Sequence, residues 1–178
     1  MDKVILVDEN NKKIGLEDKL AAHQKGLLHR AFSILIFNSS KEFLLQRRAN
    51  NKYHTPGLWT NTCCSHPLHN ESYDDAIHRR LYEEMGMECN LEKSYSFVYK
   101  SKLNENLTEF EHDTVFIGQT NKKPIINKSE VSEFRYVNIN DLLIEVESNP
   151  NSFTPWFKMI VNNLDNYFFE SKNFSFNA

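Results

Sequence analysis

Five side chains in this 178-residue sequence are of the types that hold a divalent metal ion. They are three histidines and two glutamates: His23, His29, His66, Glu109 and Glu111. Imidazole nitrogens and carboxylate oxygens together form a ligand set that suits zinc, manganese or magnesium. Spacing along the chain does not by itself bring the five together, and a lone histidine is more often a surface or core residue than a ligand. The remaining histidines are interpreted in that way: His54, His69, His78 and His112.

Glu109 and Glu111 are separated by one residue, and the segment that follows them to Ile117 has the composition of a strand. If the extended backbone reaches back to Glu109, both carboxylates point to the same face. Two carboxylates on one face repel each other by about 1 kcal/mol or more, depending on burial, unless a metal ion or a proton lies between them. A solvent-facing edge would also tolerate the pair, so the pattern leaves both interpretations open.

A charged helix is predicted between Ser72 and Gly86. Ser72 fits the N-cap, two aspartates follow in the first turn, and glycine suits the left-handed position that ends a helix. At 100° per residue, one side of this helix carries Tyr73, Ile77, Leu81 and Glu84. Because the apolar members of this set face the core, Glu84 also points inward, which is costly unless its carboxylate meets a cation. The plain alternative is an ordinary pair with Arg80, worth a few tenths of a kcal/mol.

Apolar and alternating segments predict the remaining elements. Strands are expected at residues 4–7, 32–37, 42–47, 58–60, 95–102, 109–117 and 134–137. The 32–37 segment is almost wholly apolar, which indicates a strand covered on both faces, and a turn at 38–40 makes 42–47 the second arm of a hairpin. Helical character is weak at 16–22; Asn140 is expected to cap a short helix through Val146, and Thr154 and Pro155 to open a final helix. Strands interleaved with helices in both orders predict a mixed α/β domain.

Composition narrows the possible classes of protein. The chain is 40% hydrophobic and 25% charged, as in ordinary soluble proteins, and its length suits one domain. A net charge of −3 argues against nucleic-acid binding through bulk electrostatics. The apolar run at residues 4–7 is too short for a signal peptide or a membrane span. Three cysteines, two of them adjacent, form no disulfide framework, which favours a reducing cytosol.

The predicted helix and the residues before it closely resemble the Nudix box. That box reads Gly, five residues, Glu, seven residues, Arg-Glu, two residues, Glu-Glu, one residue, Gly. The matching positions here are Ser65, Glu71, Arg79-Arg80, Glu83-Glu84 and Gly86. Ser65 replaces the leading glycine, and Arg80 replaces a glutamate that helps to hold the catalytic magnesium in diphosphate-hydrolysing members. The resemblance implies an α/β (α+β) Nudix fold with a mixed β-sheet sandwiched between helices, and the lost glutamate argues against hydrolysis.

Several further segments resemble one branch of the Nudix fold, the type 1 isopentenyl-diphosphate isomerases. The matches lie at residues 16–23, 29–32, 46–49 with Lys52, 59–67, 109–111 and 154–156. Ser65 again departs, since most members have glycine after the catalytic cysteine. The resemblance covers nearly the whole chain and implies a single domain over residues 1–178, with a core at about 30–146 and a C-terminal helix at about 155–170.

The resemblance implies isomerisation of isopentenyl diphosphate to dimethylallyl diphosphate through a tertiary carbocation. Cys64 and Glu111 would be the acid/base pair on opposite faces of the substrate, assisted by Tyr99. On a strand, adjacent cysteines face opposite ways, so Cys64 would share the face of His66 while its neighbour Cys63 becomes a buried structural thiol. Trp156 would stabilise the cation by a cation–π contact of about 2 kcal/mol when desolvated.

The resemblance also implies two metal ions and a diphosphate clamp. One ion, Mn²⁺, Mg²⁺ or Zn²⁺, would bind His23, His29, His66, Glu109 and Glu111, and a Mg²⁺ ion would bridge from Glu84 to the diphosphate. The implied substrate-binding residues are Lys19, Arg48, Lys52, Arg80, Trp156 and Ser65. A solvated basic loop is the plain alternative for the cations near residue 48. In the isomerase interpretation Arg80 binds phosphate, so the diphosphate is held rather than cut.

Two other function classes remain as alternatives. A Nudix hydrolase of a diphosphate-containing metabolite would need a fuller set of box carboxylates and would have no need of Cys64. A non-catalytic Nudix-like binding module would show no turnover. For the isomerase we expect a small-molecule substrate, no nucleic-acid or membrane partner, a monomer or weak dimer, and a cytoplasmic location.

Overall fold

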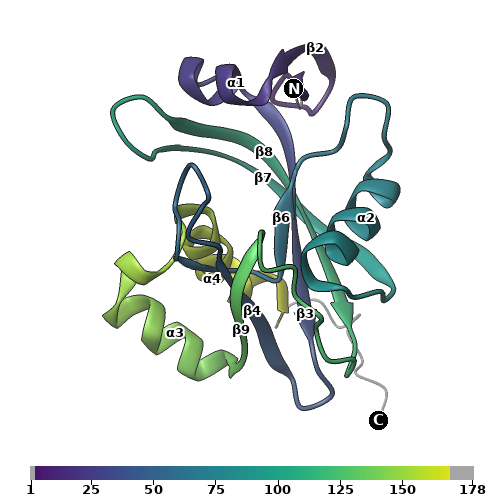
Figure 1. The fold of residues 1–178 in the computed structure, drawn as a ribbon, viewed down its shortest axis with the longest axis vertical. Coiled ribbons are helices and arrows are strands. Elements are labelled where there is room, and N and C mark those ends of the chain that lie inside the picture. The colour runs from purple at the N-terminus through teal and green to yellow at the C-terminus, as the bar shows by residue number, and fades with distance from the viewer. Residues whose placement is uncertain (1–2, 169–178) are drawn as a thin grey trace.

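A mixed sheet of nine strands forms the centre of the computed structural model, which describes residues 3–168 (Figure 1). The strands are β1 (Lys3–Val7), β2 (Lys13–Asp18), β3 (His29–Phe37), β4 (Glu42–Arg48), β5 (Trp59–Thr60), β6 (Cys63–Ser65), β7 (Leu91–Lys102), β8 (Thr108–Gln119) and β9 (Val131–Asn138). The helices are α1 (Lys19–Lys25), α2 (Tyr73–Met85), α3 (Ile139–Ser148) and α4 (Pro155–Phe168), with a short 3₁₀ turn, η1, at Pro150–Ser152. No helix within the described residues is long and apolar enough to cross a membrane.

Strand β3 is the hub of this sheet, because it pairs with four other strands. One edge runs parallel to β8 along its whole length, with His29 directly opposite Glu111. The other edge is shared by β1, β6 and β4. On the far side of β8, β7 runs antiparallel and places Tyr99 opposite Glu111. The register alone therefore brings one predicted metal ligand and one predicted catalytic residue beside Glu111.

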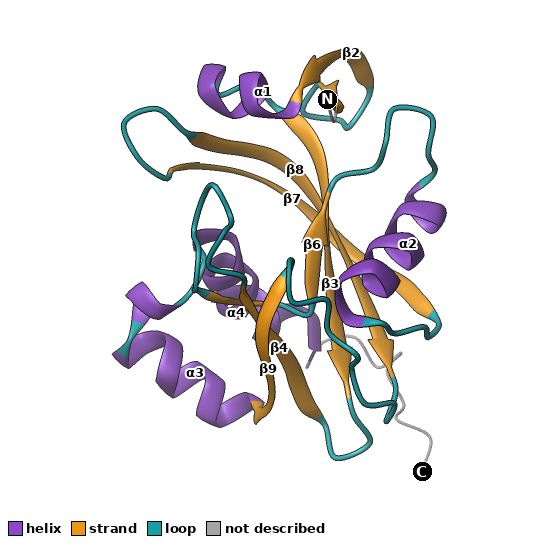
Figure 2. Cartoon of the chain, viewed as in Figure 1, coloured by secondary structure: helices purple, strands orange, loops and turns teal. Residues whose placement is uncertain are grey.

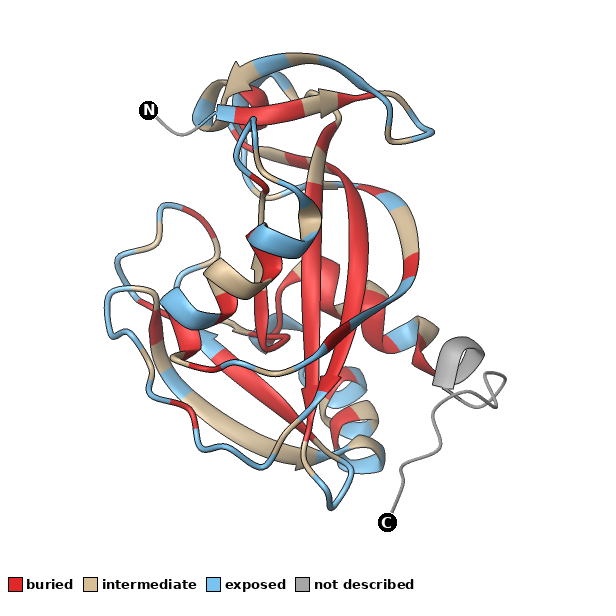
Figure 3. Ribbon diagram, turned by 90° about the vertical axis from the view of Figure 1, so that its right-hand side faces the viewer, coloured by how far each residue is buried: buried red, intermediate tan, exposed pale blue. Residues whose placement is uncertain are grey.

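Helices cover both faces of the sheet, as the predicted Nudix architecture requires (Figure 2). Alternate residues of β3 pack into separate cores: Leu35 and Phe37 contact the side of α3 and α4, whereas Ile34 and Ile36 contact the side of α2. Burial is concentrated in the central strands (Figure 3). The prediction that the 32–37 strand is covered on both faces is confirmed, because its period-two alternation supplies both cores.

The helix predicted between Ser72 and Gly86 forms as expected. The hydroxyl of Ser72 accepts a hydrogen bond from the backbone N–H of Asp75, and Gly86 ends α2 at φ 61°, in the left-handed region. A side chain on Gly86 would meet the carbonyl oxygen of Ile125 at 2.6 Å, so the following loop packs directly against this glycine. The last helix also begins at Pro155, as predicted, while residues 169 and 170 of its predicted span lie outside the described residues.

Two predicted local features are wrong. The 16–22 segment is not a helix from its start: it completes β2 and then enters α1 at Lys19, because residues 13–18 pair with β1. The cap of the 140–146 helix is Asn138, whose side-chain oxygen accepts from the N–H of Asn140, so α3 begins earlier than expected. The first error arises because the pairing of residues 13–18 with β1 is not visible in the local sequence. The second arises because Asn138 and Asn140 are both suitable caps and lie two residues apart.

The predicted 32–47 hairpin is only partly correct. The turn forms, but β3 and β4 pair at a single position, Phe37 with Phe43, and β4 pairs mainly with β9. Thr62 lies between the separated strands: its hydroxyl accepts from the N–H of Ile36 at 3.0 Å and donates to the carbonyl of Leu44 at 2.6 Å. The Thr62 hydroxyl therefore bridges β3 and β4 where their backbones do not pair directly, and the two strands diverge here.

Candidate active site

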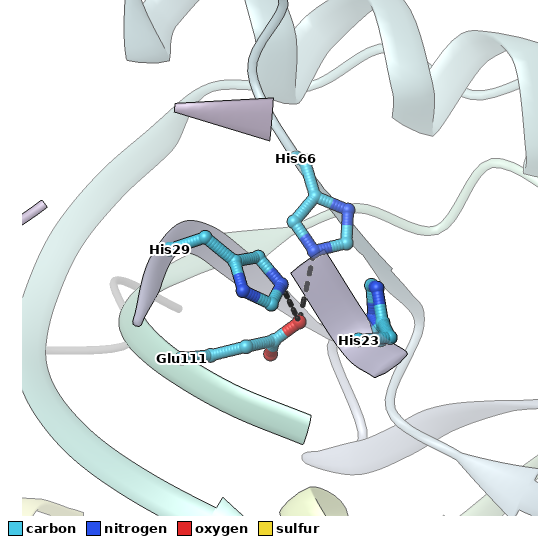
Figure 4. A group of neighbouring side chains, drawn as sticks. All are labelled: His23, His29, His66 and Glu111. Carbon is cyan, nitrogen blue, oxygen red and sulfur yellow. Dashed lines mark hydrogen bonds and ion pairs between the residues drawn. The ribbon is translucent and has the colours of Figure 1, made fainter. Parts of the chain in front are cut away.

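Three histidines and Glu111, from separate parts of the chain, meet at the start of β3 (Figure 4). His23 lies in α1, His29 begins β3, and His66 directly follows β6. The Nε2 atoms of His29 and His66 lie 3.4 and 2.8 Å from Oε1 of Glu111. One potential ligand atom from each of the four residues lies within 4.8 Å of the others. The parallel pairing of β3 with β8 thus assembles a potential metal site.

Glu109 adds a second carboxylate on the His23 side, with its Oε2 atom 3.2 Å from Nε2 of His23. Glu109 and Glu111 are only 2% and 7% exposed, so the interpretation as a solvent-facing edge is wrong. Burial and the charge of Glu111 raise the pKa of Glu109. Burial also acts to raise the pKa of Glu111, but the neighbouring imidazoles of His29 and His66 hold it well below its ordinary value. Two buried carboxylates this close require a proton or a cation.

The donor set fits a divalent metal ion. Nδ1 of His23 lies 2.6 Å from the carbonyl of Lys19, and Nδ1 of His29 lies 2.8 Å from the carbonyl of Leu27. A carbonyl only accepts, so each Nδ1 carries the proton and each Nε2 presents a lone pair. Those two Nε2 atoms and Oε2 of Glu109 are buried, with no hydrogen-bond partner among the described residues. Such atoms are costly to leave unpaired, and a bound cation would satisfy them.

Cys64 lies on the pocket side of β6, and Cys63 lies in the core beneath α2. The prediction that the two thiols face opposite ways is therefore confirmed. Burial raises the pKa of Cys64 to about 12, so the thiol keeps its proton at neutral pH. Across the pocket, the hydroxyl of Tyr99 donates a 2.6 Å hydrogen bond to Oε2 of Glu111. The structure thus brings together the three predicted catalytic residues, whose roles stay predictions.

The predicted phosphate-binding cations converge on the same pocket from α1, the end of β4, the loop after β4, and α2: Lys19, Arg48, Lys52 and Arg80. Burial lowers the pKa of Lys19, although both glutamates of the metal cluster oppose this. Lys52 and Arg80 share one carboxylate, that of Glu130, with Lys52 in close contact and Arg80 at 3.3 Å. The plain interpretation of the cations near residue 48 as a solvated loop is wrong for Arg48, which is 8% exposed.

Glu84 points inward from α2, as its place on the helix predicts, and is 5% exposed. Its carboxylate accepts a hydrogen bond of 2.9 Å from the side-chain amide of Gln46 and forms a close ion pair with Arg80. The two interpretations offered by the sequence are therefore the same arrangement: the cation that compensates the inward carboxylate is its neighbour four residues earlier. Binding of Mg²⁺ at Glu84 stays a prediction.

The predicted catalytic residues, the four cations and Glu84 line one open pocket. Trp156, 3% exposed, forms part of its wall, and the guanidinium of Arg48 lies 5.5 Å from the ring centroid. Ser65 lines the same pocket at the end of β6. A second hollow, shared through Lys19, Lys52 and Arg80, extends the cationic end toward solvent.

Comparison with known proteins gives the family. The NUDIX domain family matches residues 27–157. The chain is 50% identical over 165 residues to isopentenyl-diphosphate Delta-isomerase 2 of Photorhabdus laumondii, which covers 92% of this chain and 93% of that protein. It is 48% identical over 155 residues to isopentenyl-diphosphate Delta-isomerase 2 of Aromatoleum aromaticum, covering 87% and 82%. The chain belongs to the isopentenyl-diphosphate Delta-isomerase family.

Solved structures agree on the fold. A crystal structure of a Deinococcus radiodurans protein superposes with a TM-score of 0.76 at 18% identity and covers 91% of this chain and 98% of that one. A MutT protein from Methanosarcina mazei gives 0.65 at 20% identity, covering 78% and 94%. At these identities the likeness concerns the fold alone, and it places this isomerase-family chain within the Nudix architecture that the sequence predicts.

The sequence interpretation missed two residues of this isomerase-family pocket. The sequence predicts no site role for His54, but its side chain is 8% exposed, lines the pocket, and has its Nε2 atom 3.6 Å from Oε1 of Glu109. The sequence predicts no role for Glu130 either, yet its carboxylate joins Lys52 to Arg80. The one sequence feature that could have indicated a site role for His54 is its position next to the basic segment at Arg47, Arg48 and Lys52. No sequence feature indicated such a role for Glu130. The interpretation of the other three histidines agrees with their places outside both groups of potential metal ligands.

Proposed function

We propose that this protein is an isopentenyl-diphosphate Delta-isomerase, which converts isopentenyl diphosphate to dimethylallyl diphosphate and so supplies isoprenoid biosynthesis. Its relatives carry that name. The observation that carries the proposal is the content of one pocket: a thiol, a hydrogen-bonded carboxylate and an indole lie together with four cations. A hydrophobic diphosphate is the substrate class that such a pocket suits.

In this proposal, Cys64 and Glu111 exchange protons with the substrate from opposite faces. One of them adds a proton to the terminal methylene, and the other removes a proton from the carbon two bonds away, so the double bond moves and the atoms balance. An unactivated alkene is a poor base, so protonation requires a positioned acid and exclusion of water. The hydrogen bond from Tyr99, at 2.6 Å, orients the Glu111 carboxylate for this task.

The carbocation between the two proton transfers needs an electron-rich wall without a nucleophile. Trp156 would supply this wall, and its burial and its place in the pocket lining support that role. A desolvated cation–π contact contributes about 2 kcal/mol. The guanidinium of Arg48 lies 5.5 Å from the centroid of the same ring, so this indole contacts a cation within the protein.

The remaining predicted residues would bind the diphosphate and two metal ions. Lys19, Arg48, Lys52 and Arg80 supply positive charge, and Ser65 lines the same end of the pocket. A divalent ion at the His/Glu cluster, which would be Mn²⁺, Mg²⁺ or Zn²⁺, would supply fixed positive charge beside Glu111. Glu84, now in a close ion pair with Arg80, would help to hold a Mg²⁺ ion, which would supply positive charge to the diphosphate.

Nudix hydrolysis is the less favoured function. The position of the box that supplies a metal-binding glutamate in hydrolases is Arg80 here, and its guanidinium contacts the carboxylates of Glu83, Glu84 and Glu130. A cation in that place neutralises the box carboxylates and reduces their capacity to gather magnesium for water attack. We also propose a single domain that acts as a monomer or weak dimer in the cytoplasm, with no nucleic-acid or membrane partner.

The decisive experiment is proton NMR of the purified protein with isopentenyl diphosphate and Mg²⁺ in deuterated water, with free phosphate assayed in parallel. Formation of dimethylallyl diphosphate carrying deuterium in its methyl group, without phosphate release, is the expected result. Cys64→Ala and Glu111→Gln should each abolish this conversion. Phosphate release without isomerisation would instead favour the hydrolase, and neither signal from metal-loaded protein would favour a binding module.

A further inference from the structure

His54 lies against the metal cluster in a geometry that the five predicted ligands do not explain. Two groups of potential ligand atoms share His23: one includes His29, His66 and Glu111, and the other includes His54 and Glu109. In the second group, the two oxygens of Glu109 are divided between histidines, with Oε2 3.2 Å from His23 and Oε1 3.6 Å from His54. We propose that His54 is a further metal ligand, on the Glu109 side of the site.

The separations between donor atoms favour this assignment. Metal bonds of about 2.0–2.2 Å at angles of 90–109° place neighbouring ligand atoms about 2.8–3.6 Å apart. The histidine–carboxylate distances for His66, His23 and His29 are 2.8, 3.2 and 3.4 Å. The distance for His54, 3.6 Å, falls at the end of the same range and is too long for a hydrogen bond. The histidine–carboxylate distance expected for two ligands of one metal ion therefore fits His54 as well as it fits the other three histidines.

The ring of His54 has the same orientation as those of His23 and His29, with Nδ1 toward an oxygen and Nε2 toward a carboxylate. Its Nδ1 atom lies 3.2 Å from Oγ1 of Thr55, and its Nε2 atom faces Glu109. His23 and His29 also place Nδ1 against an oxygen and Nε2 toward a carboxylate. The hydroxyl of Thr55 can accept a hydrogen bond from Nδ1, and in that tautomer the Nε2 lone pair is available, which is the usual arrangement around a metal-binding imidazole.

The backbone around His54 is fixed at some cost. Thr55 has φ 46°, a left-handed conformation that is a genuine outlier for a β-branched residue. The guanidinium of Arg48 donates to the carbonyls of both His54 and Thr55, each at 3.2 Å. Strained residues persist where the surrounding structure enforces them, and they concentrate at functional sites. Here the enforced turn delivers the imidazole to Glu109.

Metal binding itself tests this proposal, without any isoprenoid substrate, so its outcome is independent of the proposed isomerase activity. Metal-free protein would be titrated with Mn²⁺ while free Mn²⁺ is followed by electron paramagnetic resonance, and with Co²⁺ while its visible absorption is recorded. We expect His54→Ala to weaken Mn²⁺ binding tenfold or more and to change the Co²⁺ spectrum. His23→Ala should do the same, as a reference ligand variant.

The matched control is His69→Ala, because that histidine is exposed and lies outside both ligand groups. His54→Gln, measured alongside, keeps a polar side chain in the turn, and circular dichroism and thermal unfolding identify any variant that fails to fold. The proposal predicts weaker Mn²⁺ binding and an altered Co²⁺ spectrum for both folded His54 variants. If a folded His54 variant has the same Mn²⁺ affinity and the same Co²⁺ absorption spectrum as His69→Ala, then His54 lines the pocket without binding metal and the proposal is overturned.

Discussion

The two ends of the pocket are stabilised in different ways. At the metal end, His23 and His29 are fully buried and Glu109 is 2% exposed. The Nε2 atoms of these two histidines and Oε2 of Glu109 have no hydrogen-bond partner among the described residues. At the anion end, the side chains of Lys52 and Arg80 are 24% and 18% exposed, and both already contact carboxylates. The metal end is therefore incomplete without a cation, whereas Lys52 and Arg80 at the anion end are already held by carboxylates of the protein.

This difference predicts that the two ends affect different kinetic constants. In the proposed mechanism the buried cluster includes the reacting carboxylate of Glu111, so it should act on the chemical step. Ion pairs at a partly exposed mouth should act on substrate binding, because an interaction made equally in the bound and transition states changes KM more than kcat.

The largest expected effect is that of Glu109→Gln. The change keeps the shape of the side chain but removes one negative charge from the buried cluster. It should therefore weaken metal binding and alter the proton affinity of Glu111. We expect kcat to fall on the order of 100-fold or more, with KM within a few-fold of the parent. Steady-state kinetics on metal-loaded protein measure this.

Glu105→Gln is the control, because that side chain lies in the turn between β7 and β8, is 90% exposed and pairs with Lys102 at the protein surface. A rise in KM with an unchanged kcat for Glu109→Gln would contradict the assignment of the cluster to the chemical step.

Lys52→Gln is expected to show the opposite pattern. Loss of one of the four clamp cations should raise KM about tenfold or more, corresponding to about 1.4 kcal/mol of charge-assisted binding, with kcat changed less. Lys122→Gln is the control, since Lys122 lies after β8 and contacts the carbonyl of Glu88. If kcat falls and KM stays, Lys52 acts on the chemistry and the two ends are not separable.

The contrast between the two ends also explains what the sequence could predict. Only parts of the metal end were predictable from short-range patterns: Glu109 and Glu111 share a strand face, and Cys64 shares the face of His66. The inward Glu84 followed from the 3.6-residue helical period. These relations are set by backbone geometry within a few residues, and the structure reproduces them. Grouping the three histidines with the two glutamates required the resemblance to the isomerases.

Long-range and conformational features escaped prediction. His54 reaches Glu109 only because residues 49–58 turn back with Thr55 in a left-handed conformation, which its residue type disfavours. Glu130 meets Lys52 and Arg80 through a loop whose backbone bonds to Ala49 and, at Asn127, to Glu84. The separation of β3 from β4 depends on Thr62, a residue outside both strands. No local pattern encodes these contacts.

Glu130→Gln tests whether the anion end is organised before substrate binds. The change removes the shared partner of Lys52 and Arg80 but keeps the size of the side chain. We expect KM to rise a few-fold, because the two cations lose the contact that holds them together, while kcat is retained. Isothermal titration with inorganic pyrophosphate should show a parallel loss of affinity.

Glu133→Gln is the matched control, since its carboxylate is 56% exposed and pairs with Arg47 on the neighbouring strand. Glu130→Asp keeps the charge and should recover part of the pyrophosphate affinity. Tighter pyrophosphate binding in Glu130→Gln would show that Glu130 competes with the ligand rather than positioning the cations.

The smallest expected effect concerns Glu71 and Arg79, an ion pair at the outer hollow beside the anion end. Hydrogen bonds from Arg79 lower the pKa of Glu71, helped by the N–H of Leu68 and opposed by partial burial. A carboxyl whose pKa is depressed on folding stabilises the protein above its unfolded-state pKa and loses that contribution as pH falls through the folded-state value. Because this pair is partly exposed, it should contribute only about 0.5–1 kcal/mol at neutral pH.

Urea unfolding of the parent and of Glu71→Gln at several pH values measures this contribution. The parent should be more stable at pH 7, and the difference should shrink as pH falls below about 4.5, where the unfolded carboxyl binds its proton. A difference that stays constant down to acidic pH would indicate that Glu71 acts through its shape and its bond to the N–H of Leu68 rather than through charge. Added salt separates these two causes, because it weakens an exposed ion pair and leaves a neutral hydrogen bond nearly unchanged.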